Sequence, residues 1–169
     1  YPKYEDMFSA FKSFVELLPS DGTFIACSDD EGSGSLLSHA RRKGLNVISY
    51  SLQSEMTINS PQWIQARSLK PNLRGGYDFS AMTNVGAAAA SVLHVSLQVP
   101  GEHNVRNALA TLSVAATLGL SLQRAAAALS DFTGTGRRFE ILGERKGVTV
   151  IDDYAHHPTE IRATLAGAK

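Results

Sequence analysis

The sequence predicts an α/β fold, with one domain followed by the beginning of a second. Three observations support this prediction. Near the start of the chain two strand-like runs flank a helical segment, further along three strand-like runs follow one another, and late in the chain a Thr- and Gly-rich segment interrupts the pattern. These arrangements indicate a parallel strand pair, an antiparallel meander and a linker, respectively.

The parallel pair is preceded by an amphipathic helix. Apolar residues at spacings of three and four predict this helix from Tyr4 to Leu18, and Pro19 and Gly22 end it. A strand, a helix and a second strand are then predicted at residues 23–27, 35–43 and 45–50.

The meander is followed by two helices. Its three strands are predicted at Trp63–Lys70, Tyr77–Thr83 and Ser91–Val99, because short apolar runs alternate there with turn residues. An Ala-rich helix is predicted from about Asn104 to Leu118, and a second one follows Gly119.

Thr133–Gly136 has the composition of a hinge, so we place a domain boundary there, between residues 1–135 and 136–169. The second domain is only begun. It is expected to open with a β-hairpin and a helix that starts at Pro158, the favoured first-turn position. The predicted hairpin strands are Arg138–Leu142 and Val148–Ile151.

Composition and charge exclude several classes of protein. The 16 basic residues balance 16 acidic ones, so no overall field would draw the chain to nucleic acid or an anionic membrane. A single cysteine, Cys27, has no disulfide partner, and no apolar stretch approaches the roughly 20 residues that span a bilayer. We therefore expect a cytoplasmic protein. The chain begins at Tyr1 without an initiator Met and stops inside a predicted helix, so we also expect a piece of a longer protein.

Polar residues cluster where the predicted third strand of the meander enters the following helix. A helix N-terminus carries unpaired N–H groups and a partial positive charge, which suits anions and nucleotides. Asn104 and Asn107 lie three residues apart and so share a helix face, where two amides could read the edge of an adenine ring. The alternative is structural, with Asn104 capping the helix and His103 packing over it.

Two further clusters follow the predicted hinge. Arg137 and Arg138 could swing a guanidinium onto a phosphate when two domains close, or Arg137 could pair with Glu140 on the surface. The run from Asp152 to Pro158 follows a strand and combines carboxylates with imidazoles, which suits ribose hydroxyls, a metal or proton transfer. Zinc is disfavoured because neighbouring His side chains point apart, so no metal ligand is assigned.

An acidic run, Asp29 to Glu31, directly follows the first strand of the parallel pair. Open α/β sheets place ligands in such positions, so these carboxylates could hold a metal. A solvated helix cap is the favoured interpretation.

Together, the order and content of these segments resemble the Mur ligase family, ATP-dependent enzymes that form amide bonds in cell-wall precursors. Residues 100–109 are similar to the family motif Gly-x-His-Asn-x-x-Asn-Ala, and Arg138-Phe139-Glu140 resembles its Arg-Phe-Glu motif. The most specific match is Asp152-Asp153-Tyr154-Ala155-His156-His157-Pro158-Thr159-Glu160-Ile161, which resembles the Asp-Asp-Tyr-x-His-His-Pro-Thr-Glu-Ile signature of one branch of the family.

The resemblance implies a fold and a set of roles. Residues to about Thr133 would be the latter part of a central ATPase domain, and the rest would open a Rossmann-like C-terminal domain. ATP and Mg²⁺ would be the cofactors, with no nucleic acid or membrane partner. His103, Asn104 and Asn107 would face the adenosine, Arg138 and Asp153 would reach the nucleotide from the second domain, and His156 and His157 would line the closing cleft.

Within the family, Phe139, Tyr154 and Glu160 favour the branch that joins L-alanine to UDP-N-acetylmuramate. The alternatives are the branch that attaches a whole tripeptide and a non-catalytic nucleotide-binding module. The chain departs from the family in one respect, because it contains no Gly-x-x-x-x-Gly-Lys-Ser/Thr phosphate loop. We therefore expect the isolated chain not to hydrolyse ATP.

Overall fold

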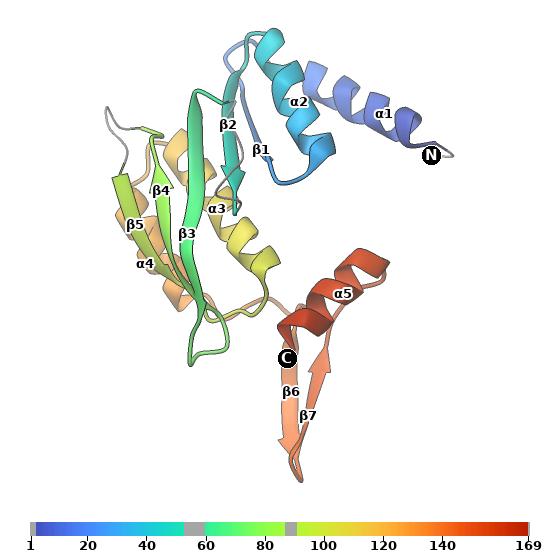
Figure 1. The fold of residues 1–169 in the computed structure, drawn as a ribbon, viewed down its shortest axis with the longest axis vertical. Coiled ribbons are helices and arrows are strands. Elements are labelled where there is room, and N and C mark those ends of the chain that lie inside the picture. The colour runs from blue at the N-terminus through green and yellow to red at the C-terminus, as the bar shows by residue number, and fades with distance from the viewer. Residues whose placement is uncertain (1–2, 53–59, 87–90, 169) are drawn as a thin grey trace.

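The computed structural model describes residues 3–52, 60–86 and 91–168, and it confirms the predicted α/β architecture (Figure 1). A five-stranded sheet carries helices on both faces, and a separate two-stranded hairpin with its helix projects from one end. The strands are β1 (Thr23–Cys27), β2 (Asn46–Ser51), β3 (Gln62–Pro71), β4 (Tyr77–Thr83), β5 (Ser91–Ser96), β6 (Glu140–Arg145) and β7 (Val148–Asp152). The helices are α1 (Tyr4–Glu16), α2 (Glu31–Arg42), α3 (Glu102–Thr117), α4 (Leu122–Asp131) and α5 (Pro158–Gly167).

The parallel pair and the antiparallel meander belong to one mixed sheet of order β1-β2-β3-β4-β5. β1 and β2 are parallel, while β3, β4 and β5 are successively antiparallel, as predicted. β3 joins the two halves because it also pairs in parallel with β2, with Ile48 opposite Gln62. This junction was not part of the sequence prediction.

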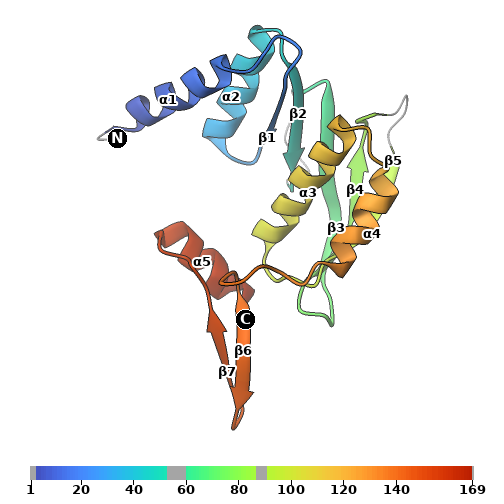
Figure 2. The ribbon, with the colours of Figure 1, turned by 180° about the vertical axis from the view of Figure 1, so that it is seen from behind.

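Two hydrophobic clusters hold the helices on opposite faces of this sheet. α3 and α4 cover one face (Figure 2), where fully buried Ile64, Leu109 and Leu112 belong to the larger cluster. α2 covers the other face at β1 and β2, and α1 packs against α2, with Val15 of α1 and Val47 of β2 buried in the smaller cluster. Burying these side chains supplies most of the favourable free energy of folding.

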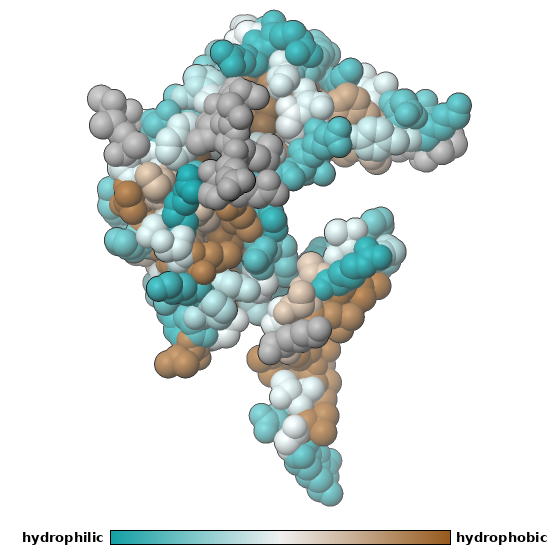
Figure 3. Space-filling model, in the orientation of Figure 1, coloured by the Kyte–Doolittle hydropathy of each residue, from teal (hydrophilic) through white to brown (hydrophobic). Residues whose placement is uncertain are grey.

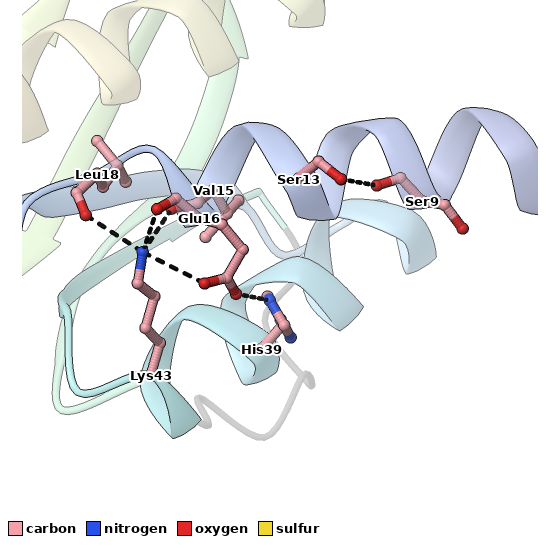
Figure 4. Close-up of polar contacts among 7 residues, drawn as sticks. All are labelled: Ser9, Ser13, Val15, Glu16, Leu18, His39 and Lys43. Carbon is pink, nitrogen blue, oxygen red and sulfur yellow. Dashed lines mark hydrogen bonds and ion pairs between the residues drawn. The ribbon is translucent and has the colours of Figure 1, made fainter.

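Polar contacts fasten α1 to α2 at the end of α1 (Figure 4). The ammonium group of Lys43 donates to the backbone oxygens of Val15, Glu16 and Leu18 at the C-terminal end of α1. Glu16 Oε1 also lies 2.7 Å from His39 Nε2. These contacts set where α1 ends relative to α2.

Two helices begin earlier than predicted. α2 begins at Glu31 instead of Ser35, because the Asp30 side chain caps it by accepting from the Ser33 backbone N–H at 2.7 Å. The acidic run therefore contains a helix cap, in agreement with the favoured interpretation. α3 begins at Glu102, and its N-cap is Gly101 with φ 89°, so the alternative interpretation, in which Asn104 caps this helix, is wrong.

The hairpin is shorter at its start than predicted. β6 begins at Glu140 instead of Arg138, because Arg137 and Phe139 have φ values of 58° and 52°, far from the extended backbone of a regular β-strand. Lys146 and Gly147, also with positive φ, form the two-residue turn between the strands.

α5 begins at Pro158 as predicted, with His157 as its N-cap. Within the described ranges, no helix is long and apolar enough to cross a membrane.

Candidate functional site

A cavity of about 640 Å³ lies between the first turns of α3 and the start of the hairpin region. This volume is within the range of small-molecule pockets. All five residues that the resemblance assigned to the nucleotide line it, with apolar walls that include Val99, Leu129 and Phe132. The five are His103, Asn104 and Asn107 from α3, and Arg138 and Asp153 from beyond the predicted hinge.

Both polar atoms of the Asn104 side-chain amide form hydrogen bonds with neighbouring protein groups. Its Nδ2 donates to the Pro100 backbone oxygen at 2.7 Å and lies 3.2 Å from His103 Nε2. Its Oδ1 accepts from Asn107 Nδ2 at 3.1 Å. Asn104 thus orients Asn107, which keeps its Oδ1 and one N–H without a partner among the described residues. An acceptor beside a donor is the pattern that can read an adenine edge.

His103 is half-buried in this cavity, and its ring contacts Asn104 in the same first turn of α3. Since Asn104 Nδ2 donates to His103 Nε2, the ring proton of neutral His103 lies on Nδ1. Burial lowers the pKa of His103, and the charges of Arg106 and Arg138 act in the same direction against the opposing effect of Asp153. A Cβ on Gly101 would lie 2.5 Å from His103 Cε1, so this ring position requires glycine there.

Asp153 binds mainly to its own part of the chain. Its two carboxylate oxygens accept from the backbone N–H groups of Phe139 and Ala155, each at 2.8 Å. Burial by itself would raise the pKa of Asp153, but these hydrogen bonds, one from Thr164 and the charge of Arg138 outweigh it and lower the pKa. Asp153 therefore stays ionised at neutral pH and shapes the cavity wall.

Arg138 enters the cavity from the turn that follows the predicted hinge. Its backbone N–H donates to the Thr135 oxygen at 3.2 Å, and its guanidinium carbon lies 5.8 Å from the Tyr154 ring centroid. The guanidinium of Arg137 instead lies 3.5 Å from Asp152, so the predicted surface pairing of Arg137 with Glu140 is wrong for the side chain.

His156 and His157 lie at the start of α5 and are not among the residues that line this cavity. The exposed His156 ring contacts Tyr154 edge-on, with Nδ1 3.6 Å from Glu160. His157 caps α5 through its side chain. Across residues 3–52, 60–86 and 91–168, no three His, Cys, Asp or Glu side chains are grouped to hold a metal ion.

Sequence reasoning missed contacts that depend on distant parts of the chain. Arg106, between the two asparagines, donates to Asp29 at 3.2 Å although the two residues are 77 positions apart. The Leu52 backbone N–H donates to the same Asp29 oxygen, so Asp29 joins the end of β2 to α3. Thr111, which also lines the cavity, could have been found because it lies four residues after Asn107 on the same helix face.

The sequence itself matches known domains over most of its length. Residues 1–115 match the Mur ligase middle domain. The chain belongs to the Mur ligase family. Residues 137–169 match a second domain of the family, described as the Mur ligase, glutamate ligase domain.

Similar proteins are members of the same family. The UDP-N-acetylmuramate–L-alanine ligase of Renibacterium salmoninarum is 40% identical over 169 residues, which cover 100% of this chain and 34% of that ligase. The chain thus spans about one third of the length of the curated relatives it matches.

Solved structures of the family share the fold. A murein peptide ligase from Psychrobacter arcticus superimposes with a TM-score of 0.69 and 31% identity, covering 98% of this chain and 32% of that one. MurF from Acinetobacter baumannii gives a TM-score of 0.75 over 96% of this chain and 32% of that one. Its 22% identity supports a likeness of fold alone.

Proposed function

We propose that this chain supplies the adenosine-facing side of the ATP site in a longer Mur ligase that joins L-alanine to UDP-N-acetylmuramate. The observation that carries the proposal is the cavity, which gathers His103, Asn104 and Asn107 from one side of the predicted hinge and Arg138 and Asp153 from the other. Residues 1–135 and 136–169 would be the two domains that close on the nucleotide, with Thr133–Gly136 as their hinge.

In the proposed reaction, ATP phosphorylates the muramoyl carboxylate and ADP leaves. The amine of L-alanine then attacks the resulting acyl phosphate, the amide forms and inorganic phosphate is released. Negative charge develops on the phosphoryl oxygens, so a positioned cation such as Arg138 stabilises the transition state. Mg²⁺ would supply further charge neutralisation, but the described residues form no cluster of ligands for it.

The choice of alanine as acceptor rests on relatives and motif residues. The relative at 40% identity is named as the alanine ligase, while the similar murein peptide ligase structure is 31% identical. Phe139, Tyr154 and Glu160 also favour the alanine branch. Assays of the longer protein with free L-alanine and with the tripeptide would separate the two, and faster turnover of the tripeptide would overturn the alanine assignment.

ATP binding can be tested on the 169-residue chain by an NMR titration. Replacing Asn107 or Arg138 with Ala should weaken binding of ATP about tenfold or more, because each variant loses a hydrogen bond or a charge-assisted contact. Arg145→Ala is the matched control, since Arg145 lies on β6 and outside the cavity. Unchanged ATP affinity in both cavity variants would contradict the proposed site.

Asp153 should behave differently from Arg138 in the same experiments. Asp153→Ala removes the acceptor of two backbone N–H groups, so it should lower stability by about 1 to 2 kcal/mol as well as weaken ATP binding. Arg138→Ala should leave the thermal melting temperature unchanged. The isolated chain, which has no phosphate loop, should release no phosphate from ATP above a buffer control, even with Mg²⁺.

A further inference from the structure

The turn that carries Arg138 has an unusual backbone. Arg137 and Phe139, its neighbours on either side, both have positive φ values, of 58° and 52°. Residues with a Cβ avoid this left-handed region, which glycine occupies freely. Because neither flanking residue is glycine, contacts from outside the turn must hold it in this conformation.

Two carboxylates supply those contacts. Glu140 Oε2 accepts from the Arg137 backbone N–H at 2.7 Å, and Asp153 Oδ2 accepts from the Phe139 backbone N–H at 2.8 Å. The Tyr154 N–H donates to the Arg137 oxygen, also at 2.8 Å. Ionised acceptors make stronger hydrogen bonds than neutral ones, so the two carboxylates hold the turn from both sides of Arg138.

The two carboxylates differ in where they lie. Asp153 lines the cavity beside Arg138 and His103, so its substitution would disturb the turn and the cavity together. Glu140 is not among the residues that line that cavity, although it lines a neighbouring pocket that also includes Arg138 and Phe139. Its hydrogen bond to the Arg137 backbone links Glu140 to the cavity through the turn.

We propose that Glu140 is a positioning residue, which holds the left-handed backbone of Arg137 so that Arg138 points into the nucleotide cavity. This inference rests on the proposed function, because Arg138 is the group through which Glu140 acts. Glu140 does not itself contact the nucleotide. The hydrogen bond from the Arg137 N–H to the Glu140 carboxylate stabilises a positive φ at Arg137, which a glycine at that position would adopt without strain.

The test measures two properties of the 169-residue chain by NMR. The first is hydrogen exchange of the Arg137 amide, which reports on the turn. The second is affinity for ATP. Glu140→Ala should speed exchange at Arg137 and weaken ATP binding about as much as Arg138→Ala does, roughly tenfold or more. Glu140→Gln keeps an oxygen acceptor and should recover part of both losses. Glu144→Ala, an exposed change on the same strand, is the matched control and should alter neither.

A second variant separates positioning from a general loss of structure. Arg137→Gly adopts the positive φ without strain, so adding it to Glu140→Ala should restore ATP affinity to that of Arg137→Gly alone. No rescue, or unchanged Arg137 exchange in Glu140→Ala, would overturn the positioning role. If Asn107→Ala and Arg138→Ala both bind ATP like the wild type, the proposed function fails instead, and exchange at Arg137 still decides whether Glu140 holds the turn.

Discussion

The sheet with α1 to α4 and the hairpin with α5 differ in how far their apolar side chains are buried. Every buried apolar side chain of the described residues lies between Val15 and Ala126, and none belongs to residues 136–168. Figure 3 shows apolar atoms over the hairpin and α5. The exposed apolar residues there include Ile141, Leu142, Val148, Val150 and Leu165.

This difference indicates that the two regions are stabilised in different ways. The first has its own hydrophobic core, in two clusters of buried side chains. The second depends on hairpin hydrogen bonds, on the α5 capping box and on contacts with the first region. Gly167 at the end of α5, for example, lies so near Gly101 that a Cβ added to Gly167 would be 3.5 Å from the Gly101 backbone. The cavity lies where the two regions meet, so its geometry depends in part on the hairpin and α5, the region without buried apolar side chains.

The largest expected effect contrasts equivalent substitutions in the two regions. Leu112→Ala removes a fully buried side chain and should lower the free energy of unfolding by about 2 to 5 kcal/mol. Leu142→Ala removes a side chain that is 61% exposed and should change it by less than about 0.5 kcal/mol. Urea unfolding followed by circular dichroism measures both, and equal losses would show that the regions share one core.

A smaller effect is expected at the contact between the regions. Gly101→Ala forces a Cβ residue to φ 89° and also drives its Cβ into the His103 ring, so it should cost about 2 kcal/mol or more. Gly119→Ala has a similar backbone, φ 69°, but no atom within 4 Å of its Cβ, so only the backbone cost of about 1 kcal/mol should appear. Thermal melts compare the two, and ATP titrations should show a loss of affinity for Gly101→Ala alone.

The smallest expected effect concerns pH and the α1–α2 contact. The hydrogen bond to His39 is the main cause that lowers the pKa of Glu16, assisted by Lys43 and opposed by burial. A carboxyl group whose pKa is lower in the folded state stabilises above its ordinary pKa of 4.5, and this contribution is lost as the pH falls through the folded value. Because the pair is exposed, the effect should be slight.

Glu16→Gln should therefore lower the melting temperature a little at pH 6 and not at all at the acid end of the range. Melts of the wild type and the variant between pH 6 and pH 3 measure this difference. Glu5→Gln on the same helix serves as the control, since Glu5 forms no ion pair with another residue in the part of the chain that the structure describes. A difference that stays constant down to pH 3 would exclude the ionised Glu16 as its source.

The sequence by itself determined the element types, the parallel pair and the meander, whereas the five cavity residues were predicted from the resemblance of their motifs to the Mur ligase family. Hydrophobic periodicity and turn residues are patterns over a few neighbouring positions, so they can be recognised in the sequence alone. The sequence could not show that the Asn104 side chain forms hydrogen bonds with Pro100 and Asn107. Those bonds depend on a helix that starts at Glu102, two residues earlier than predicted.

Only the tertiary structure decided how distant segments cooperate. The union of the two halves through β3, the contact of Arg106 with Asp29 and the hydrogen bond of the Phe139 N–H to Asp153 join residues whose separation in sequence carries no local signal. Glu140 is only three residues from Arg137, yet its proposed role depends on the positive φ of Arg137, which an arginine at position 137 does not indicate. The sequence specifies the chemistry of each side chain, whereas the packing of the fold in three dimensions determines which groups that side chain contacts.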